Sequence, residues 1–165
     1  MDLLIAYKES RIYHKGVRLK IAGIFNNNEY KKEILDFIRL NGLSEFIDFL
    51  GYCNDIKLYM VHAKGFIMPS YNEGLGRVVV EAMFYGCPVI ARASGGINEF
   101  MKDTKNGFLF TSNEELTSLL QMICDFDDID FLRSAQDYAQ QNFSEEVYGK
   151  KIISIYNQVV KNNRS

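Results

Sequence analysis

The segment from Pro69 to Glu99 holds two glutamates and several glycines whose types and spacing suit chemistry on a polar, charged ligand. Glu73 and Glu81 have seven residues between them, and glycines stand at positions 74 and 76. The apolar run 65–69, which precedes the glutamates, predicts a buried strand. The run 77–85 predicts a buried helix that ends at the following glycine.

A strand, a glycine turn and a helix in this order form a ready site for an anion. The free backbone N–H groups at the start of the helix point at whatever lies beyond the carboxyl end of the strand. Glu73 would lie at the turn, and Glu81 a little over one turn inside the helix. Amides that bind a phosphate, with two carboxylates nearby to accept hydrogen bonds from hydroxyl groups, suit a nucleotide-sugar. The same local pattern also occurs in many α/β proteins that bind nothing there.

Length and composition limit the class of protein. The 165 residues, 47% of them hydrophobic, can bury one core, so we expect a single globular domain over residues 1–165. A net charge of −2 and a pI of about 5.7 argue against a general surface for nucleic acid or anionic membrane. No apolar run reaches the roughly 18 residues of a membrane span, and the first residues do not fit a signal peptide. We therefore expect a soluble, cytoplasmic protein; peripheral attachment of a longer enzyme to a membrane stays open.

Other chemistry-bearing residues fit structural roles. The cysteines at positions 53, 87 and 124 are more than thirty residues apart without metal-ligand spacing, which indicates reduced packing residues. His14 and His62 are isolated. The acidic run Asp125–Asp130 contains Asp-x-Asp, but it directly precedes a predicted helix, whose dipole favours acids. We therefore expect no metal site.

Apolar periodicity predicts strands and helices that alternate along the chain. Before residue 65, we expect helices at 2–10, 29–40 and 55–63, and strands at 17–23 and 47–51. A strand through LLIAY is the alternative for the first helix. After residue 86, we expect strands at 87–91 and 107–110, and helices at 98–103, 114–124, 130–141 and 145–161.

Short connections between alternating strands and helices are typical of a doubly wound parallel sheet. We therefore predict a Rossmann-like α/β fold of about five strands with helices on both faces. Ligands of such sheets bind beyond the carboxyl ends of the strands. Gly23, Gly51, Glu73 and Gly96 all fall at such ends.

A family resemblance adds to this reading. Pro-Ser, Glu-Gly-x-Gly, Glu-Ala, Pro-Val-Ile-Ala and Gly-Gly-x-x-Glu follow one another between Pro69 and Glu99. This order resembles the signature of the retaining glycosyltransferases of family 4 (glycosyl transferases group 1), which have the two-domain GT-B architecture. The resemblance covers nearly the whole chain and corresponds to the carboxyl-terminal, donor-binding domain of these enzymes.

The resemblance implies roles for the two glutamates and the glycine turn. In the family the first glutamate contacts hydroxyls of the transferred sugar, so Glu73 is assigned to the catalytic position. The second holds the ribose, which assigns that role to Glu81; an exposed helix carboxylate is the alternative. Amides of Gly74, Leu75 and Gly76 would lie near the sugar and the diphosphate.

Further donor contacts follow from the same resemblance. Tyr52 and Cys53 would contact the base, largely through their backbone, although an ordinary loop is equally compatible with the sequence. Gly95 and Gly96 would border the sugar. Arg77 would be directed at phosphate, with a surface cation as the alternative.

The resemblance also implies what this chain lacks. In the family a strand, then an Arg and a Lys that neutralise the diphosphate, and a whole acceptor domain precede the first helix. We therefore expect a chain that is truncated at its N-terminus, without the family's first strand and without the acceptor domain. That strand is central in the family's sheet. Its loss predicts a gap that the domain closes, fills with MDLLIAY as a strand, or fills with a strand borrowed from another copy.

The resemblance therefore implies the donor-binding half of a retaining glycosyltransferase of carbohydrate or cell-envelope biosynthesis. It would use a UDP-, GDP- or ADP-sugar without a metal, transfer the sugar to an acceptor hydroxyl, and be inactive alone. Two alternatives stay open: a non-catalytic remnant that binds a nucleotide or a partner, and half of a nucleotide-sugar epimerase.

Overall fold

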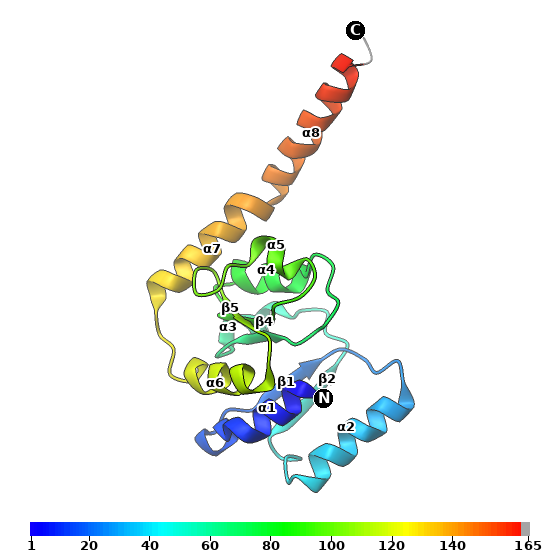
Figure 1. The fold of residues 1–165 in the computed structure, drawn as a ribbon, viewed down its shortest axis with the longest axis vertical. Coiled ribbons are helices and arrows are strands. Elements are labelled where there is room, and N and C mark those ends of the chain that lie inside the picture. Colours follow the sequence, from blue (N-terminus) through cyan, green and yellow to red (C-terminus); the bar gives the residue numbers. More distant parts are fainter. Residues whose placement is uncertain (163–165) are drawn as a thin grey trace.

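The computed structural model describes residues 1–162 as an α/β body from which one long helix projects (Figure 1). Helices and strands alternate along most of the chain. The first part contains α1 (Asp2–Ser10), the 3₁₀ helix η1 (Ile12–Lys15), β1 (Leu19–Ala22), α2 (Asn28–Leu40), β2 (Ile47–Gly51) and α3 (Lys57–His62). The second part contains β3 (Phe66–Met68), α4 (Arg77–Phe84), β4 (Val89–Arg92), α5 (Ile97–Phe100), β5 (Phe108–Phe110), α6 (Asn113–Ile123), α7 (Ile129–Phe143) and α8 (Glu145–Asn162).

The five parallel strands form two sheets. β1 pairs with β2, and β4 pairs with β3 on one edge and β5 on the other. The α/β class, the parallel strands and their number agree with the prediction. Over residues 1–162 no strand pairing joins β1 to β3, so these strands do not close the expected gap. Within the segment MDLLIAY, Met1 is the N-cap of α1 and the other residues lie in the helix, which confirms the predicted helix and excludes this segment as the strand that fills the gap. A strand borrowed from another copy stays a prediction.

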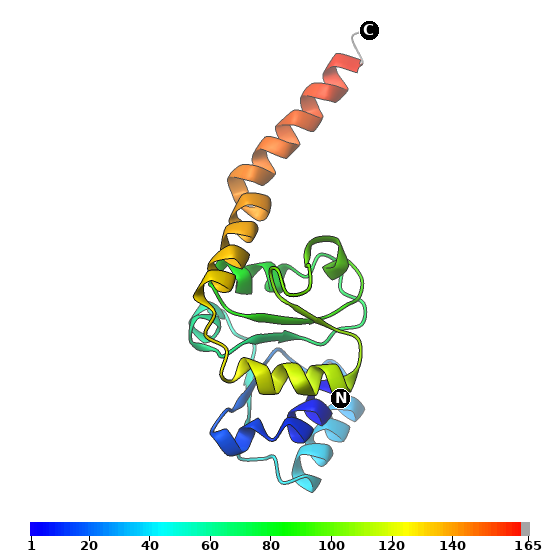
Figure 2. The same cartoon turned by 60° about the vertical axis from the view of Figure 1, so that its left-hand side comes forward.

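Helices cover both faces of the three-stranded sheet (Figure 2). α4 lies over one face, α6 covers the other, and α1 packs on the outer side of α6. All four residues of β4 are buried, as expected for a central parallel strand. Because β4 lies between β3 and β5, it fixes the position of the loop that follows Arg92.

The buried side chains form two clusters rather than the one core predicted from chain length. The larger cluster joins α1, α2, β1 and β2 to the face of the second sheet that α6 covers, and it includes Tyr7 and Phe110. The smaller cluster lies under α4 and includes Val79, Met83 and Ile97. The two sheets are thus held together by side-chain packing.

Several helices begin at a residue whose side chain accepts a hydrogen bond from a backbone N–H group of the first turn. The Asn27 side chain accepts a hydrogen bond from Tyr30 N at the start of α2, and Ser112 and Glu115 form a capping box at α6. Asp128 accepts a hydrogen bond from Phe131 N and caps α7. The acidic run before α7 therefore has the predicted role of a helix start.

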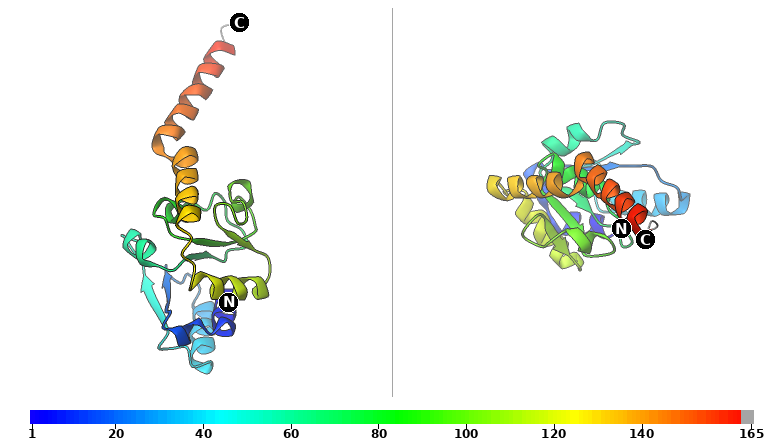
Figure 3. Two further views of the ribbon diagram at one scale, coloured as in Figure 1. Left: turned by 90° about the vertical axis from the view of Figure 1, so that its left-hand side faces the viewer. Right: turned by 90° about the horizontal axis from the view of Figure 1, so that it is seen from above.

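The last helix departs from the body. α8 continues beyond α7 as a rod whose far end lies away from both sheets (Figure 3). It packs against the preceding helix, α7. Its exposed large apolar side chains are Tyr148, Ile153, Ile155, Tyr156, Val159 and Val160. In the part of the chain that the structure describes, no helix combines the length and apolarity needed to cross a membrane.

The environments of the three thiols predict unequal reactivity. Cys87 and Cys124 are buried, whereas Cys53 is half-buried in the loop after β2. Burial raises the pKa of Cys87 to about 12 and also raises the pKa of Cys124. Because the thiolate is the reactive form, we expect Cys53 alone to react quickly with a disulfide reagent at pH 8. All three should react in denaturant; rapid labelling of Cys87 in the folded protein would contradict this packing.

Candidate functional site

The loops that follow β3 and β4 are joined to each other at the carboxyl ends of these strands. Gly96 N donates a hydrogen bond to Glu73 O at 3.0 Å. Ser94 Oγ donates to Ser70 O, also at 3.0 Å. The structure therefore brings the two glycine-containing segments, which are more than twenty residues apart in sequence, into one site.

This close approach explains the two adjacent glycines. A Cβ atom at Gly96 would overlap the carbonyl oxygen of Gly74, and one at Gly95 would overlap that of Glu73. Both obstacles are backbone atoms, which cannot rotate away. Gly95 also has a φ of +54°, a region that residues with a side chain rarely adopt. The resemblance placed these glycines at the sugar; the structure adds a packing role that the sequence alone did not reveal.

The glycine turn before α4 leaves backbone donors free. Gly76, with a φ of +64°, is the N-cap residue of α4, and no side chain caps this helix end. The first N–H groups of the helix therefore lack intrahelical acceptors. Gly76 also packs against Ile97, whose Cδ1 atom would meet any added Cβ. Arg77 is exposed at the first position of the helix, next to these donors, and its assignment to phosphate stays a prediction.

Both glutamates flank this helix start. Glu73 lies in the turn, with its Cγ next to Gly76, and Glu81 is the fifth residue of α4. Each is half-buried, and neither carboxylate has a hydrogen-bond or ion-pair partner in residues 1–162. A partly desolvated carboxylate without a partner is free to accept hydrogen bonds from a ligand. Their assignment to sugar and ribose stays a prediction.

The two residues predicted to contact the base of the nucleotide follow β2, not β3 or β4. Tyr52 and Cys53 directly follow β2, which belongs to the two-stranded sheet rather than to the sheet of β3 and β4. Tyr52 is 77% exposed. Over the described part of the chain no hydrogen bond connects these two residues to the loops after β3 and β4, so the structure joins only part of the predicted set.

Sequence reasoning missed one charged residue at this edge. The strand predicted to end at Ala91 extends to Arg92, whose side chain is only 6% exposed. Its Nε donates a hydrogen bond to Pro69 O at 3.1 Å. An arginine directly after an apolar run resembles the start of a loop, so the pattern contained no signal that this side chain is buried.

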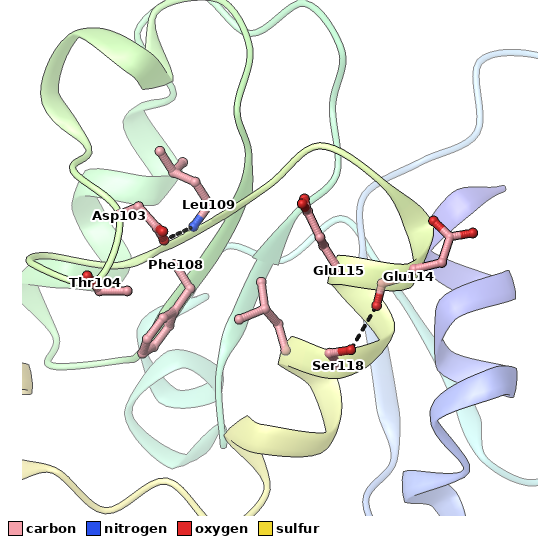
Figure 4. Close-up of a pocket in the computed structure, with 8 residues that line it drawn as sticks. Asp103, Thr104, Phe108, Leu109, Glu114, Glu115 and Ser118 are labelled. Atoms are coloured by element: carbon pink, nitrogen blue, oxygen red, sulfur yellow. Dashed lines mark hydrogen bonds between the residues drawn. The ribbon is translucent and has the colours of Figure 1, made fainter.

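A shallow, open hollow lies elsewhere, between β5 and the start of α6 (Figure 4). Three acidic residues line it, Asp103, Glu114 and Glu115, but two of them already accept hydrogen bonds from backbone N–H groups. Asp103 accepts a hydrogen bond from Leu109 N at 2.9 Å, and Glu115 accepts from Thr111 N as part of the capping region of α6. Because these carboxylates stabilise local structure, this hollow is a weaker candidate for a ligand than the glycine turn. Throughout residues 1–162, no group of three or more His, Cys, Asp or Glu side chains is placed to hold a metal ion.

The arrangement of strands, glycine loops and helices is that of the GT-B glycosyltransferases. It matches HepE of Anabaena in complex with UDP with a TM-score of 0.85 and 26% identity, over 95% of this chain and 44% of that chain. HepE in complex with UDP-glucose matches with a TM-score of 0.82 and 27% identity, with the same coverage of both chains.

The chain belongs to the family described as "Glycosyl transferases group 1", which matches residues 2–142. Alpha-monoglucosyldiacylglycerol synthase of Acholeplasma laidlawii is 31% identical over 99% of this chain and 41% of its own length. An uncharacterized glycosyltransferase of Haemophilus influenzae is 27% identical over 79% of this chain and 39% of its own length. The chain thus spans about two fifths of the length of these relatives.

Proposed function

We propose that this chain is the donor-binding half of a retaining glycosyltransferase that takes a sugar from a nucleotide-diphosphate sugar and transfers it to an acceptor hydroxyl. The observation that carries the proposal is the uncapped start of α4 between two half-buried carboxylates without partners. Family membership favours a transferase over the epimerase alternative. UDP and UDP-glucose are bound in the structurally similar HepE, which supports a uridine nucleotide as the first donor to test.

Each part of the site suits one part of such a donor. Backbone amides of Gly74, Leu75 and Gly76 and the start of α4 would bind the diphosphate, whose charge the helix dipole favours. Glu73 would accept hydrogen bonds from the sugar and Glu81 from the ribose.

The remaining predicted donor residues complete the proposed site. Gly95 and Gly96 would close the sugar end, Tyr52 and Cys53 would face the base, and Arg77 would add positive charge near the phosphates. The leaving diphosphate would depart on the face that the acceptor approaches. The backbone amides of Gly74, Leu75 and Gly76 would stabilise the negative charge on this leaving group, without a metal.

The rest of the enzyme is also part of the proposal. The chain corresponds to less than half of its relatives, so we assign acceptor binding to a separate amino-terminal domain. We further propose that the enzyme acts in the cytoplasm. This chain alone should bind donor weakly and transfer no sugar at a measurable rate, because the acceptor and the reacting sugar would not be held together.

A titration of the purified chain tests this function. UDP-glucose, GDP-glucose and ADP-glucose are added separately while backbone amide signals are followed by NMR. We expect one donor to move the signals of Gly74, Gly76 and Arg77, with weak, saturable binding, and to leave those of Gly149 in α8 unchanged. Glucose and inorganic diphosphate are the controls for binding of one part of the donor.

The outcomes separate the proposal from its alternatives. Saturable shifts at the glycine turn support a donor site. If none of the three donors perturbs this turn, the chain does not bind donor here and the non-catalytic remnant becomes the better description. Rapid sugar transfer to any acceptor by the purified chain would overturn the assignment of acceptor binding to another domain.

A further inference from the structure

Arg92 is a buried cation at the carboxyl end of β4 that the proposed donor contacts leave without a function. Its side chain is 6% exposed. A charge that is removed from water costs free energy unless it is paired and its donors are satisfied. The contacts that satisfy Arg92 therefore identify the groups whose positions depend on it.

These contacts come from three separate segments. Nε donates to Pro69 O at 3.1 Å, and Nη1 donates to Thr111 O at 3.4 Å. Nη2 donates to Asp2 Oδ2 at 2.6 Å in an ion pair with the first turn of α1. One guanidinium group thus joins the ends of β3 and β5 to a helix from the other half of the fold.

Aromatic rings enclose the same guanidinium. Its Cζ lies 4.0 Å from the ring centroid of Tyr71 and 4.8 Å from that of Phe110. The Tyr71 hydroxyl donates to Asp2 Oδ2 at 2.6 Å, the same oxygen that accepts from Arg92. Tyr71 is therefore held at its ring face by the arginine and at its hydroxyl by the aspartate.

This network lies directly before the glycine turn that precedes α4. Pro69 and Tyr71 precede Glu73 by four and two residues. On the other side of Tyr71, Glu73 O accepts the hydrogen bond from Gly96 N. The segment 69–76 is thus anchored at its start by Arg92 and in its middle by the second glycine loop.

We propose that Arg92 is a positioning residue that, through Asp2 and Tyr71, holds segment 69–76 in its donor-binding conformation. A planar guanidinium can donate in three directions and stack between two rings at once. A lysine supplies one point charge and cannot do both. The inference rests on the proposed function only where donor affinity is measured; the conformation of the segment is tested without ligand.

The first experiment compares amide spectra of the ligand-free protein. Arg92→Lys and Asp2→Asn should shift or broaden the signals of Gly74 and Gly76, while the signal of Gly149 in α8 stays in place. Tyr71→Phe removes one hydroxyl from a residue that is 63% exposed, so this variant keeps the fold and should show the same pattern more weakly. Asp48→Asn is the matched control, because Asp48 on β2 pairs with Lys20 on β1 and with Arg18 directly before β1, in the other sheet.

The second experiment measures UDP-glucose affinity of the same variants. Arg92→Lys and Asp2→Asn should weaken binding about tenfold, which corresponds to about 1.4 kcal/mol, and Asp48→Asn should not change it. Variants with lower melting temperatures but wild-type glycine signals and wild-type affinity would overturn the proposal, since Arg92 would then serve the fold alone. If the wild-type protein binds no nucleotide-sugar, the proposed function fails, and the ligand-free spectra still decide the role of Arg92.

Discussion

Replacing Gly96 with alanine is expected to destabilise the protein by about 3 kcal/mol and to abolish donor binding. The new Cβ would overlap Gly74 O, a backbone atom in the turn that we assign to the diphosphate. Gly96 has a φ of −65° and a ψ of −15°, which alanine adopts freely. The whole effect therefore comes from the lost space between the two loops. Thermal unfolding should show a midpoint lower by roughly 10 °C for a domain of this size.

Gly149→Ala is the control for this substitution. Gly149 lies inside α8, and a Cβ there would meet no atom within 4 Å. Alanine at this position should stabilise the helix by about 0.5–1 kcal/mol and leave donor binding unchanged. If Gly96→Ala melts at the wild-type temperature and binds donor normally, the two loops are not packed against each other in solution as the structure has them.

Replacing Glu81 with alanine is expected to weaken binding of the preferred donor by about ten- to a hundredfold. A carboxylate that accepts hydrogen bonds from ribose contributes about 1.5–3 kcal/mol, and about 1.4 kcal/mol corresponds to a factor of ten. Because the ribose belongs to the nucleotide, UDP and UDP-glucose should both lose affinity. Isothermal titration calorimetry with each ligand measures this. Glu73→Ala should instead weaken UDP-glucose and leave UDP unchanged, since its proposed partner is the sugar.

A ligand lacking the ribose hydroxyls makes the Glu81 test specific. Dideoxy-UDP should bind the wild-type protein as weakly as UDP binds Glu81→Ala, and the two changes together should cost little more than either alone. Glu33→Ala, an exposed acid on α2, is the control for removal of one negative charge. Full additivity of the ligand and protein changes would move ribose recognition to another residue.

Much of the fold could be read from local patterns. The hydrophobic spacing of α2, α4 and α6 and the short apolar strands identified the α/β class, and all five strands occur where apolar runs predicted them. The helix at the N-terminus was also preferred correctly over the strand. η1 was missed, since IYHK carries no helical period and its turn depends on Gly16 at a φ of +80°.

Residue types and their order in the sequence were enough to determine the class of this protein, because strand and helix periods and a dense motif are local properties of the chain. Only the tertiary structure decided that the strands form two sheets, that Gly95 and Gly96 make room for the backbone of Glu73 and Gly74, and that Arg92 is buried against Asp2. These features join residues up to ninety positions apart. Such contacts depend on how elements pack in space, and no period or spacing along the chain encodes them.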